Sequence, residues 1–155
     1  MTPTFVPASP TDLGEIRAVL SASGLPAGDV DQQIEHFLLA KQGGRTIGTV
    51  AIEYAGDAAL LRSLCVVPEH RGRDLGAHLL TAIEAKAASR GVRDLFLLTT
   101  SSMAFFEQRG FSPTPRAAAP QSIQATAQFR TLCPSSAICM HKSLSGSSGE
   151  GITPR

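Results

Sequence analysis

The stretch VVPEHRGRDLGAHLL, residues 66–80, restricts the possible folds of this chain more than any other segment. An apolar run enters it and stops at Pro68, which has no backbone N–H to donate to a sheet ladder. Two glycines, Gly72 and Gly76, then flank a basic turn, and apolar residues at helical spacing follow. The segment therefore predicts a strand that ends in a glycine-containing turn and continues as a helix.

This turn has the features of an anion site. A strand that feeds such a turn into a helix directs backbone N–H groups and the positive end of the helix dipole at one point. That point attracts phosphate or pyrophosphate, and Arg71 and Arg73 add positive charge. The stretch matches neither the G-x-x-x-x-G-K-[ST] nor the G-x-G-x-x-G nucleotide motif. The turn alone therefore leaves open whether its glycines hold an anion or only serve the chain geometry.

Strand-like and helix-like segments alternate along the chain. Apolar or alternating runs predict strands at residues 4–6, 36–41, 46–55, 58–67, 94–100, from 111, and 137–141. Helical spacing and caps predict helices from 9–12 to about 24, at 75–90, 102–109 and 120–132, with a short helix or loop at 29–33. The alternation predicts an α/β fold with a mixed central sheet flanked by helices.

Length and composition favour one globular domain that handles a small molecule. A chain of 155 residues fits a single domain, here residues 1–143, and the Ser- and Gly-rich residues 144–155 predict a flexible tail. The formal charge of +1 gives no reason to expect nucleic acid or a membrane as partner. There is neither a signal-peptide pattern nor an apolar run of membrane-spanning length, so we expect a cytoplasmic protein.

The cysteines give no sign of a disulfide framework or a metal site. Cys65, Cys133 and Cys139 form no C-x-x-C pair, and the interpretation we prefer is that of buried, reduced thiols. The four histidines show no metal-ligand spacing, so no metal is expected. An arsenic-binding site built from the three thiols is an alternative, since trivalent arsenic prefers soft ligands, but the sequence does not show that they converge.

A charge pair is predicted on an otherwise apolar hairpin. The runs 46–55 and 58–67 are joined by Gly56-Asp57, whose leading glycine suits a two-residue hairpin turn. In that register Glu53 and Arg62 are diagonal neighbours on one face of the sheet, close enough for long side chains to meet.

The motifs resemble those of the GNAT N-acetyltransferase superfamily. The stretch LCVVPEHRGRDLGAHLL looks like that family's acetyl-CoA motif, and AFFEQRGF at residues 104–111 resembles its A-x-FYEKLGF segment. The resemblance implies the GNAT fold and acetyl-CoA as co-substrate. It also implies that the backbone of Leu64, Cys65 and Val66 pairs with the pantetheine arm. The turn around the pyrophosphate would then be Arg71, Gly72, Arg73, Asp74, Leu75, Gly76 and Ala77, with Phe106 as a further cofactor contact.

Two positions depart from the family pattern. Asp74 stands where the family usually has glycine, and Phe106 replaces its frequent tyrosine general acid. A carboxylate near a pyrophosphate is repulsive unless it points to solvent or pairs with an arginine. We therefore expect the Asp74 side chain to turn outward and cofactor binding to be retained. Without the tyrosine, the reaction would depend on positioning, polarisation of the carbonyl by backbone amides, and water.

On the acceptor side, Glu53 is the first candidate for the base that takes a proton from the amine, because its hairpin borders the expected pantetheine strand. Arg62 is a candidate for binding an acidic group on the substrate, since a guanidinium grips oxyanions bidentately. The alternative for both residues is that they only pair with each other.

A narrower resemblance concerns the acceptor. The pieces EYAGDAALLRSLCVVP, FLLTTSSMAFFEQRGF and APQSIQATAQFRTLCPSSAICM look like the arsenic-resistance branch of the superfamily. This branch implies acetyl transfer to the primary amine of a small acceptor that bears an oxyanion, either amino-acid-like or arsenical. Two alternatives remain open, namely a non-catalytic acyl-CoA-binding module and an arsenical-responsive thiol-binding protein. A homodimer is compatible with the pattern.

Overall fold

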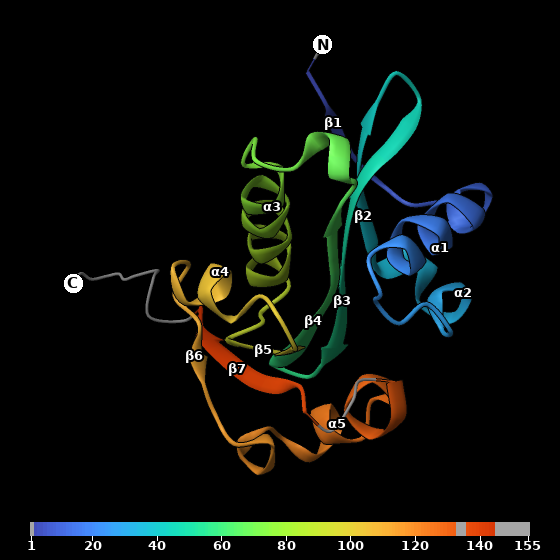
Figure 1. The fold of residues 1–155 in the computed structure, drawn as a ribbon. Coiled ribbons are helices and arrows are strands. Elements are labelled where there is room, and N and C mark those ends of the chain that lie inside the picture. Colours follow the sequence, from blue (N-terminus) through green and yellow to red (C-terminus); the bar gives the residue numbers. More distant parts are fainter. Residues whose placement is uncertain (1, 133–135, 145–155) are drawn as a thin grey trace. The chain divides into compact units, whose positions relative to one another are not determined.

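The computed structural model describes residues 2–132 and 136–144, with strands in the pairing order β1-β2-β3-β4-β5-β7-β6 (Figure 1). The strands are β1 (Thr4–Pro7), β2 (Phe37–Gln42), β3 (Arg45–Ala55), β4 (Ala58–Val66), β5 (Asp94–Thr99), β6 (Ser112–Pro113) and β7 (Ile138–Ser143). The helices are α1 (Leu13–Ala22), α2 (Val30–Gln33), α3 (Leu75–Ser89), α4 (Met103–Glu107) and α5 (Gln121–Gln124). Short 3-10 segments include η1 (Pro10–Asp12), η2 (Ile34–His36) and η3 (Pro68–His70). The predicted mixed sheet with flanking helices is confirmed.

Strand directions make the sheet mixed. The pairs β1–β2, β2–β3, β5–β7 and β6–β7 are antiparallel. The pair β4–β5 is parallel and joins Ala58–Leu60 to Asp94–Phe96, whereas β4 itself continues to Val66. The backbone of β4 beyond Leu60 therefore extends past the residues that pair with β5.

Contacts divide the chain into two compact units. The first contains the residues up to Glu53 together with Arg62–Lys86, and the second contains Tyr54–Leu61 together with the residues from Ala87 onward. One domain over residues 1–143 remains a prediction. Apart from Leu144, the expected tail at 144–155 lies outside the described residues, as does Cys133.

In the first unit, α1 and α2 cover one face of β2 and β3, and α3 covers the other (Figure 1). The face toward α1 holds a buried cluster of Ile16, Leu20, Val30, Phe37, Leu39, Ala51 and Cys65. Toward α3, a Cβ atom on Gly48 would lie 2.8 Å from Cδ1 of Leu79 and 3.3 Å from the carbonyl oxygen of Cys65. The missing side chain at Gly48 is what lets α3 approach the sheet so closely.

In the second unit, the helical segment after β6 packs on β4, β5 and β7. The cluster consists of Ala58, Leu60, Phe96, Ala119, Ile123, Phe129 and Cys139. The continuous helix predicted at 120–132 is wrong in detail, because α5 ends at Gln124 and a separate turn spans Gln128–Leu132. Cys65 and Cys139 are buried free thiols, as expected. In the part of the chain that the structure covers, no helix is long and apolar enough to cross a membrane.

Candidate functional site

The turn between β4 and α3 has an unusual backbone. Gly72 has a φ of 80° and Asp74 a φ of 62°, so two alternate residues lie in the left-handed region. Left-handed residues also occur in the turns whose successive N–H groups form anion-binding concavities. The carbonyl of Asp74 accepts the His78 amide at 3.0 Å and so begins α3. Glycine adopts this φ freely and Asp tolerates it better than most residues.

Residues of the turn differ in exposure. Arg71, Gly72, Arg73 and Asp74 are exposed, Leu75 at the start of α3 is buried, and Gly76 and Ala77 are half-buried. Asp74 is thus open to solvent, and the expected turn of its carboxylate away from a bound anion stays a prediction.

The start of the turn is fastened to the β2–β3 hairpin. Arg45 donates to Glu69 at 3.1 Å, and His70 Nε2 lies 3.1 Å from Oε1 of Gln42. Hydrogen bonds from the backbone amide of Glu69, and then from Arg45, hold the pKa of the Glu69 carboxyl below its usual value. The amide of Val67 donates to the carbonyl of Ile47 at 3.0 Å, which ties the end of β4 to β3.

A local irregularity changes which face the β4 side chains occupy. Ser63 has a φ of 60°, far from an extended strand, and its carbonyl accepts the hydroxyl of Thr49 at 2.7 Å. Arg62 and Cys65 both face α1 and α2, although they lie three residues apart. In a regular strand they would lie on opposite faces. The extra residue at Ser63 restores Cys65 to the α1 side, as a β-bulge does.

The end of β4 carries a polar network that the sequence did not reveal. Arg71 donates from Nε to the carbonyl of Val66 at 2.9 Å and from an Nη atom to Oγ of Ser23 at 3.0 Å. Sγ of Cys65 also lies 3.0 Å from Oγ of Ser23. One of the backbone groups expected to face the pantetheine arm is therefore already bonded, and the charge of Arg71 lies at the end of the strand.

Phe106 belongs to α4 in the second unit, and its side chain is buried. Its exposed fraction is 7%, and its ring meets Phe105 at 5.1 Å and Phe111 at 5.5 Å between centroids, both edge to face. These contacts account for an aromatic residue at this position without any hydroxyl. A cofactor contact of Phe106 remains a prediction.

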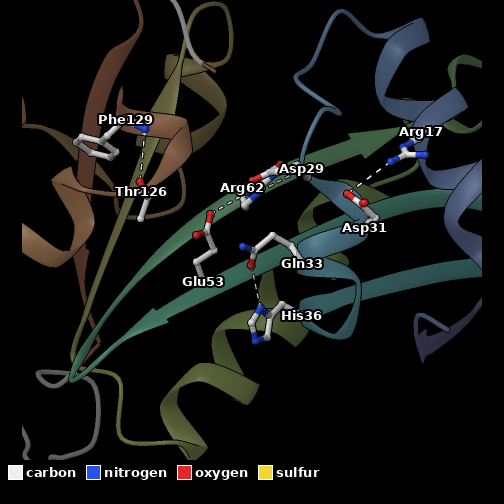
Figure 2. Close-up of polar contacts among 10 residues, drawn as sticks. Arg17, Asp29, Asp31, Gln33, His36, Glu53, Arg62, Thr126 and Phe129 are labelled. Carbon is white, nitrogen blue, oxygen red and sulfur yellow. Dashed lines mark hydrogen bonds and ion pairs between the residues drawn. The ribbon is translucent and has the colours of Figure 1, made fainter. Parts of the chain in front are cut away.

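Three charged side chains form one array in the first unit. Arg62 donates through Nη1 to Glu53 at 2.8 Å, and through Nη1 and Nη2 to Asp29 at 2.7 and 2.5 Å. Figure 2 shows the guanidinium between the two carboxylates. The predicted contact of Glu53 with Arg62 is confirmed. Asp29, which precedes α2, was not foreseen.

The array is charged and withdrawn from solvent. The side chain of Arg62 is only 1% exposed. Burial by itself lowers the pKa of such a guanidinium, but hydrogen bonds and charge from Asp29 and Glu53 outweigh it, so the pKa of Arg62 lies above its usual value. Arg62 is thus held as a cation by its two carboxylate partners. That it binds an acidic group of the substrate stays a prediction, and its present partners favour the paired alternative.

A comparison with protein families matches residues 33–113, just over half of the chain, to the acetyltransferase (GNAT) domain. The chain belongs to the GNAT acetyltransferase family. The matched range includes the left-handed turn and the charged array, except Asp29.

Curated relatives of this GNAT chain are amino-acid acetyltransferases. That of Pseudomonas fluorescens (strain Pf0-1) is 36% identical over 87 residues, which are 55% of this chain and 20% of the relative. That of Edwardsiella ictaluri (strain 93-146) is 32% identical over 103 residues, 65% of this chain and 23% of the relative. The chain thus matches only about a fifth of the length of these relatives. Neither bears out the narrower resemblance to the arsenic-resistance branch.

Solved structures agree on the GNAT fold. N-acetylglutamate synthase from Neisseria gonorrhoeae, complexed with coenzyme A and N-acetyl-glutamate, aligns with a TM-score of 0.81 at 20% identity, over 93% of this chain and 35% of that one. A Mycobacterium tuberculosis protein in complex with CoA and NLQ aligns with a TM-score of 0.78 at 17% identity, over 92% of this chain and 99% of that one. At these identities the likeness shows the fold alone.

Most of the predicted GNAT site residues belong to one unit. The residues predicted on β4 and in the turn, together with Glu53 and Arg62, all belong to the first unit, and Phe106 belongs to the second. Sequence reasoning missed Ser23, Asp29 and Ser63. A positive φ at a serine has no sequence signal, and an aspartate before a short helix reads as an ordinary turn residue.

Proposed function

We propose that this chain is an acetyl-CoA-dependent N-acetyltransferase that acetylates the primary amine of a small, amino-acid-like acceptor. The observation that carries the proposal is the left-handed backbone at Gly72 and Asp74 between β4 and α3, in a chain of the GNAT family. The names of the curated relatives support an amino acid as the acceptor class.

The residues present fit the cofactor. The amides of the turn would hold the pyrophosphate, with Arg71 and Arg73 supplying positive charge beside it. The backbone of Leu64, Cys65 and Val66 would pair with the pantetheine arm as an added strand, since β4 runs beyond its pairing with β5. Amides of the same strand would polarise the carbonyl that is to be attacked.

Bound acetyl-CoA supplies a thioester, whose carbon–sulfur bond breaks as the nitrogen–carbon bond of the product forms. The acceptor must lose one proton to become a nucleophile and a second one after attack. Glu53 takes the first proton and passes it to water, and the second proton goes through water to the departing thiolate, which leaves as the thiol. The balance is one ammonium and one acetyl thioester giving one amide, one thiol and one proton.

Release of free thiol from acetyl-CoA tests this proposal. The acceptors would be L-glutamate, other amino acids, phosphonate and arsonate amino acids, and a lysine peptide, with the acetylated product identified by mass spectrometry. We expect turnover with at least one amino acid. Glu53→Gln should lower kcat by about 10²-fold or more, while Glu35→Gln, whose side chain is 80% exposed, serves as the matched control.

A second candidate is a non-catalytic acyl-CoA-binding module. It is favoured by Phe106, which is buried among aromatic rings and provides no hydroxyl as general acid. Binding of acetyl-CoA without thiol release across the whole acceptor panel would support the module and contradict the enzyme.

A further inference from the structure

The charged array has an unequal division of contacts. Asp29 takes two nitrogen atoms of Arg62, whereas Glu53 contacts Nη1 through Oε2. A guanidinium gripped on its forked side by one carboxylate is fixed in orientation as well as in charge. Arg62 and Asp29 therefore form a closed pair, to which Glu53 is attached as a third member.

Exposure increases toward Glu53. The side chain of Arg62 is 1% exposed, that of Asp29 9% and that of Glu53 15%. Two carboxylates against one guanidinium leave one formal negative charge. Because Asp29 already balances Arg62, that charge lies at Glu53, at the more accessible end of the array. Among the described residues, none donates a hydrogen bond to Oε1 of Glu53.

We propose that Asp29 is a positioning residue, which holds Arg62 so that Arg62 fixes Oε2 of Glu53 and leaves Oε1 to receive a proton from the acceptor. This rests on the proposed function, in which Glu53 is the base. Without Asp29, the whole charge of Arg62 would act on Glu53 and oppose proton uptake, and the guanidinium would lose its fixed orientation.

The same arrangement defines the acceptor's approach. Because the excess negative charge lies at Glu53, this array attracts a cationic group. The acceptor therefore presents its ammonium to the array. Arg62 is enclosed by its two carboxylate partners and acts through Glu53. An anionic group on the acceptor is therefore bound by other residues.

The surrounding charged groups provide a matched control. Asp31 on α2 lies 3.5 Å from Arg17 on α1, and both side chains are about half exposed, at 53% and 45%. On η2, His36 lies 3.0 Å from Oε1 of Gln33 and 3.9 Å from Glu35. Figure 2 shows the pairs Asp31–Arg17 and Gln33–His36 apart from the Asp29–Arg62 contact. Asp31→Asn thus removes the same charge two residues from Asp29 without touching the array.

The experiment compares wild type with Asp29→Asn, Asp29→Ala and Asp31→Asn. Calorimetry measures acetyl-CoA binding, circular dichroism measures folding, and thiol release measures kcat and KM for the best acceptor of the panel above. We expect Asp29→Asn to lower kcat about 10- to 100-fold, with unchanged acetyl-CoA affinity and a smaller change in KM. Asp31→Asn should match wild type. An Asp29→Asn enzyme that is folded and fully active overturns the proposal.

A second readout does not need turnover. Nitrogen-15 NMR reports how fast the Arg62 side-chain N–H groups exchange with water, and we expect faster exchange in either Asp29 variant and no change in Asp31→Asn. If wild type binds acetyl-CoA but acetylates nothing, the proposed function fails by itself, and the exchange rates still decide whether Asp29 holds Arg62. Unchanged exchange in both folded Asp29 variants would overturn the positioning role.

Discussion

Gly48 on β3 and Leu79 on α3 approach so closely that an added Cβ atom on Gly48 would lie 2.8 Å from Cδ1 of Leu79. Leu79 is fully buried, and the carbonyl of Cys65 lies on another side of the same space. The end of the Leu79 side chain would have to shift inside the core, and the Cys65 carbonyl is part of the backbone. We predict that Gly48→Ala lowers the free energy of unfolding by about 1–3 kcal/mol, measured by urea denaturation.

Gly14 on α1 is the control for this substitution. A Cβ atom there would meet nothing within 4 Å, and alanine is the better helix former by roughly 0.5–1 kcal/mol. Gly14→Ala should therefore leave stability unchanged or raise it. Equal effects of the two substitutions would show that α3 does not pack on Gly48 as described.

Asp74 combines a left-handed backbone with a negative charge in the expected pyrophosphate turn. Removing the charge should tighten acetyl-CoA binding, because a carboxylate beside a pyrophosphate is repulsive. We predict that Asp74→Asn, which also tolerates positive φ, lowers the Kd severalfold in calorimetry.

Asp74→Ala separates charge from backbone conformation. Alanine removes the carboxylate but tolerates a φ of 62° poorly, so this variant should be less stable than Asp74→Asn by about 1 kcal/mol. If neither variant binds acetyl-CoA more tightly than wild type, the charge at Asp74 does not oppose the ligand.

Arg62 is buried between carboxylates, whereas Arg17 pairs with Asp31 at the surface. Arg62→Met leaves Asp29 and Glu53 uncompensated, and we predict a loss of about 3–5 kcal/mol in the free energy of unfolding. Arg17→Met should cost less than about 1 kcal/mol. Denaturant titration of both variants measures the difference, and similar losses would refute the burial of the array.

Asp12 gives the first unit a pH dependence at the acid end. Lys41 donates to its carboxylate at 2.6 Å, and the Ser9 amide donates to it at 2.9 Å. The hydrogen bond from Lys41 is the main cause that lowers the pKa of Asp12 below 3.8. A lowered folded-state pKa stabilises the fold fully above the unfolded value, and this stabilisation is lost as pH falls through the folded value.

We therefore predict that Lys41→Met destabilises the protein near neutral pH and that its difference from wild type shrinks at acid pH. Urea denaturation of both proteins between about pH 6 and pH 2 covers the relevant range. A stability difference that stays constant down to the acid limit would show that Asp12 does not titrate against Lys41.

The local elements were predictable because their signals are local. The residues from Ser9 to Asp12 predict a helix start. Gly56 forms the turn of the β3–β4 hairpin with a φ of 67°, and Gly91 follows the end of α3 with a φ of 84°. The pairing of Glu53 with Arg62 followed from that hairpin register. The site could be foreseen as far as residues close in sequence define it.

The other features of the fold and the site depend on contacts between residues that are distant in sequence. Asp29 and Arg62 are 33 positions apart, and no sequence pattern near either residue predicts its contact with the other. The left-handed Ser63 reverses the alternation of β4, so that Cys65 and not Leu64 shares the Arg62 face. A period-two pattern assumes a regular strand and cannot detect such an insertion.

The deciding measurement is calorimetric titration of acetyl-CoA into the wild-type chain, with S-acetyl-pantetheine, a fragment that lacks the pyrophosphate, as the comparison. We predict a submillimolar Kd for acetyl-CoA and much weaker binding of fragments that lack the pyrophosphate, because the turn at Gly72 and Asp74 supplies the anion contacts. No measurable binding of acetyl-CoA, or equal binding of fragments without pyrophosphate, would contradict it.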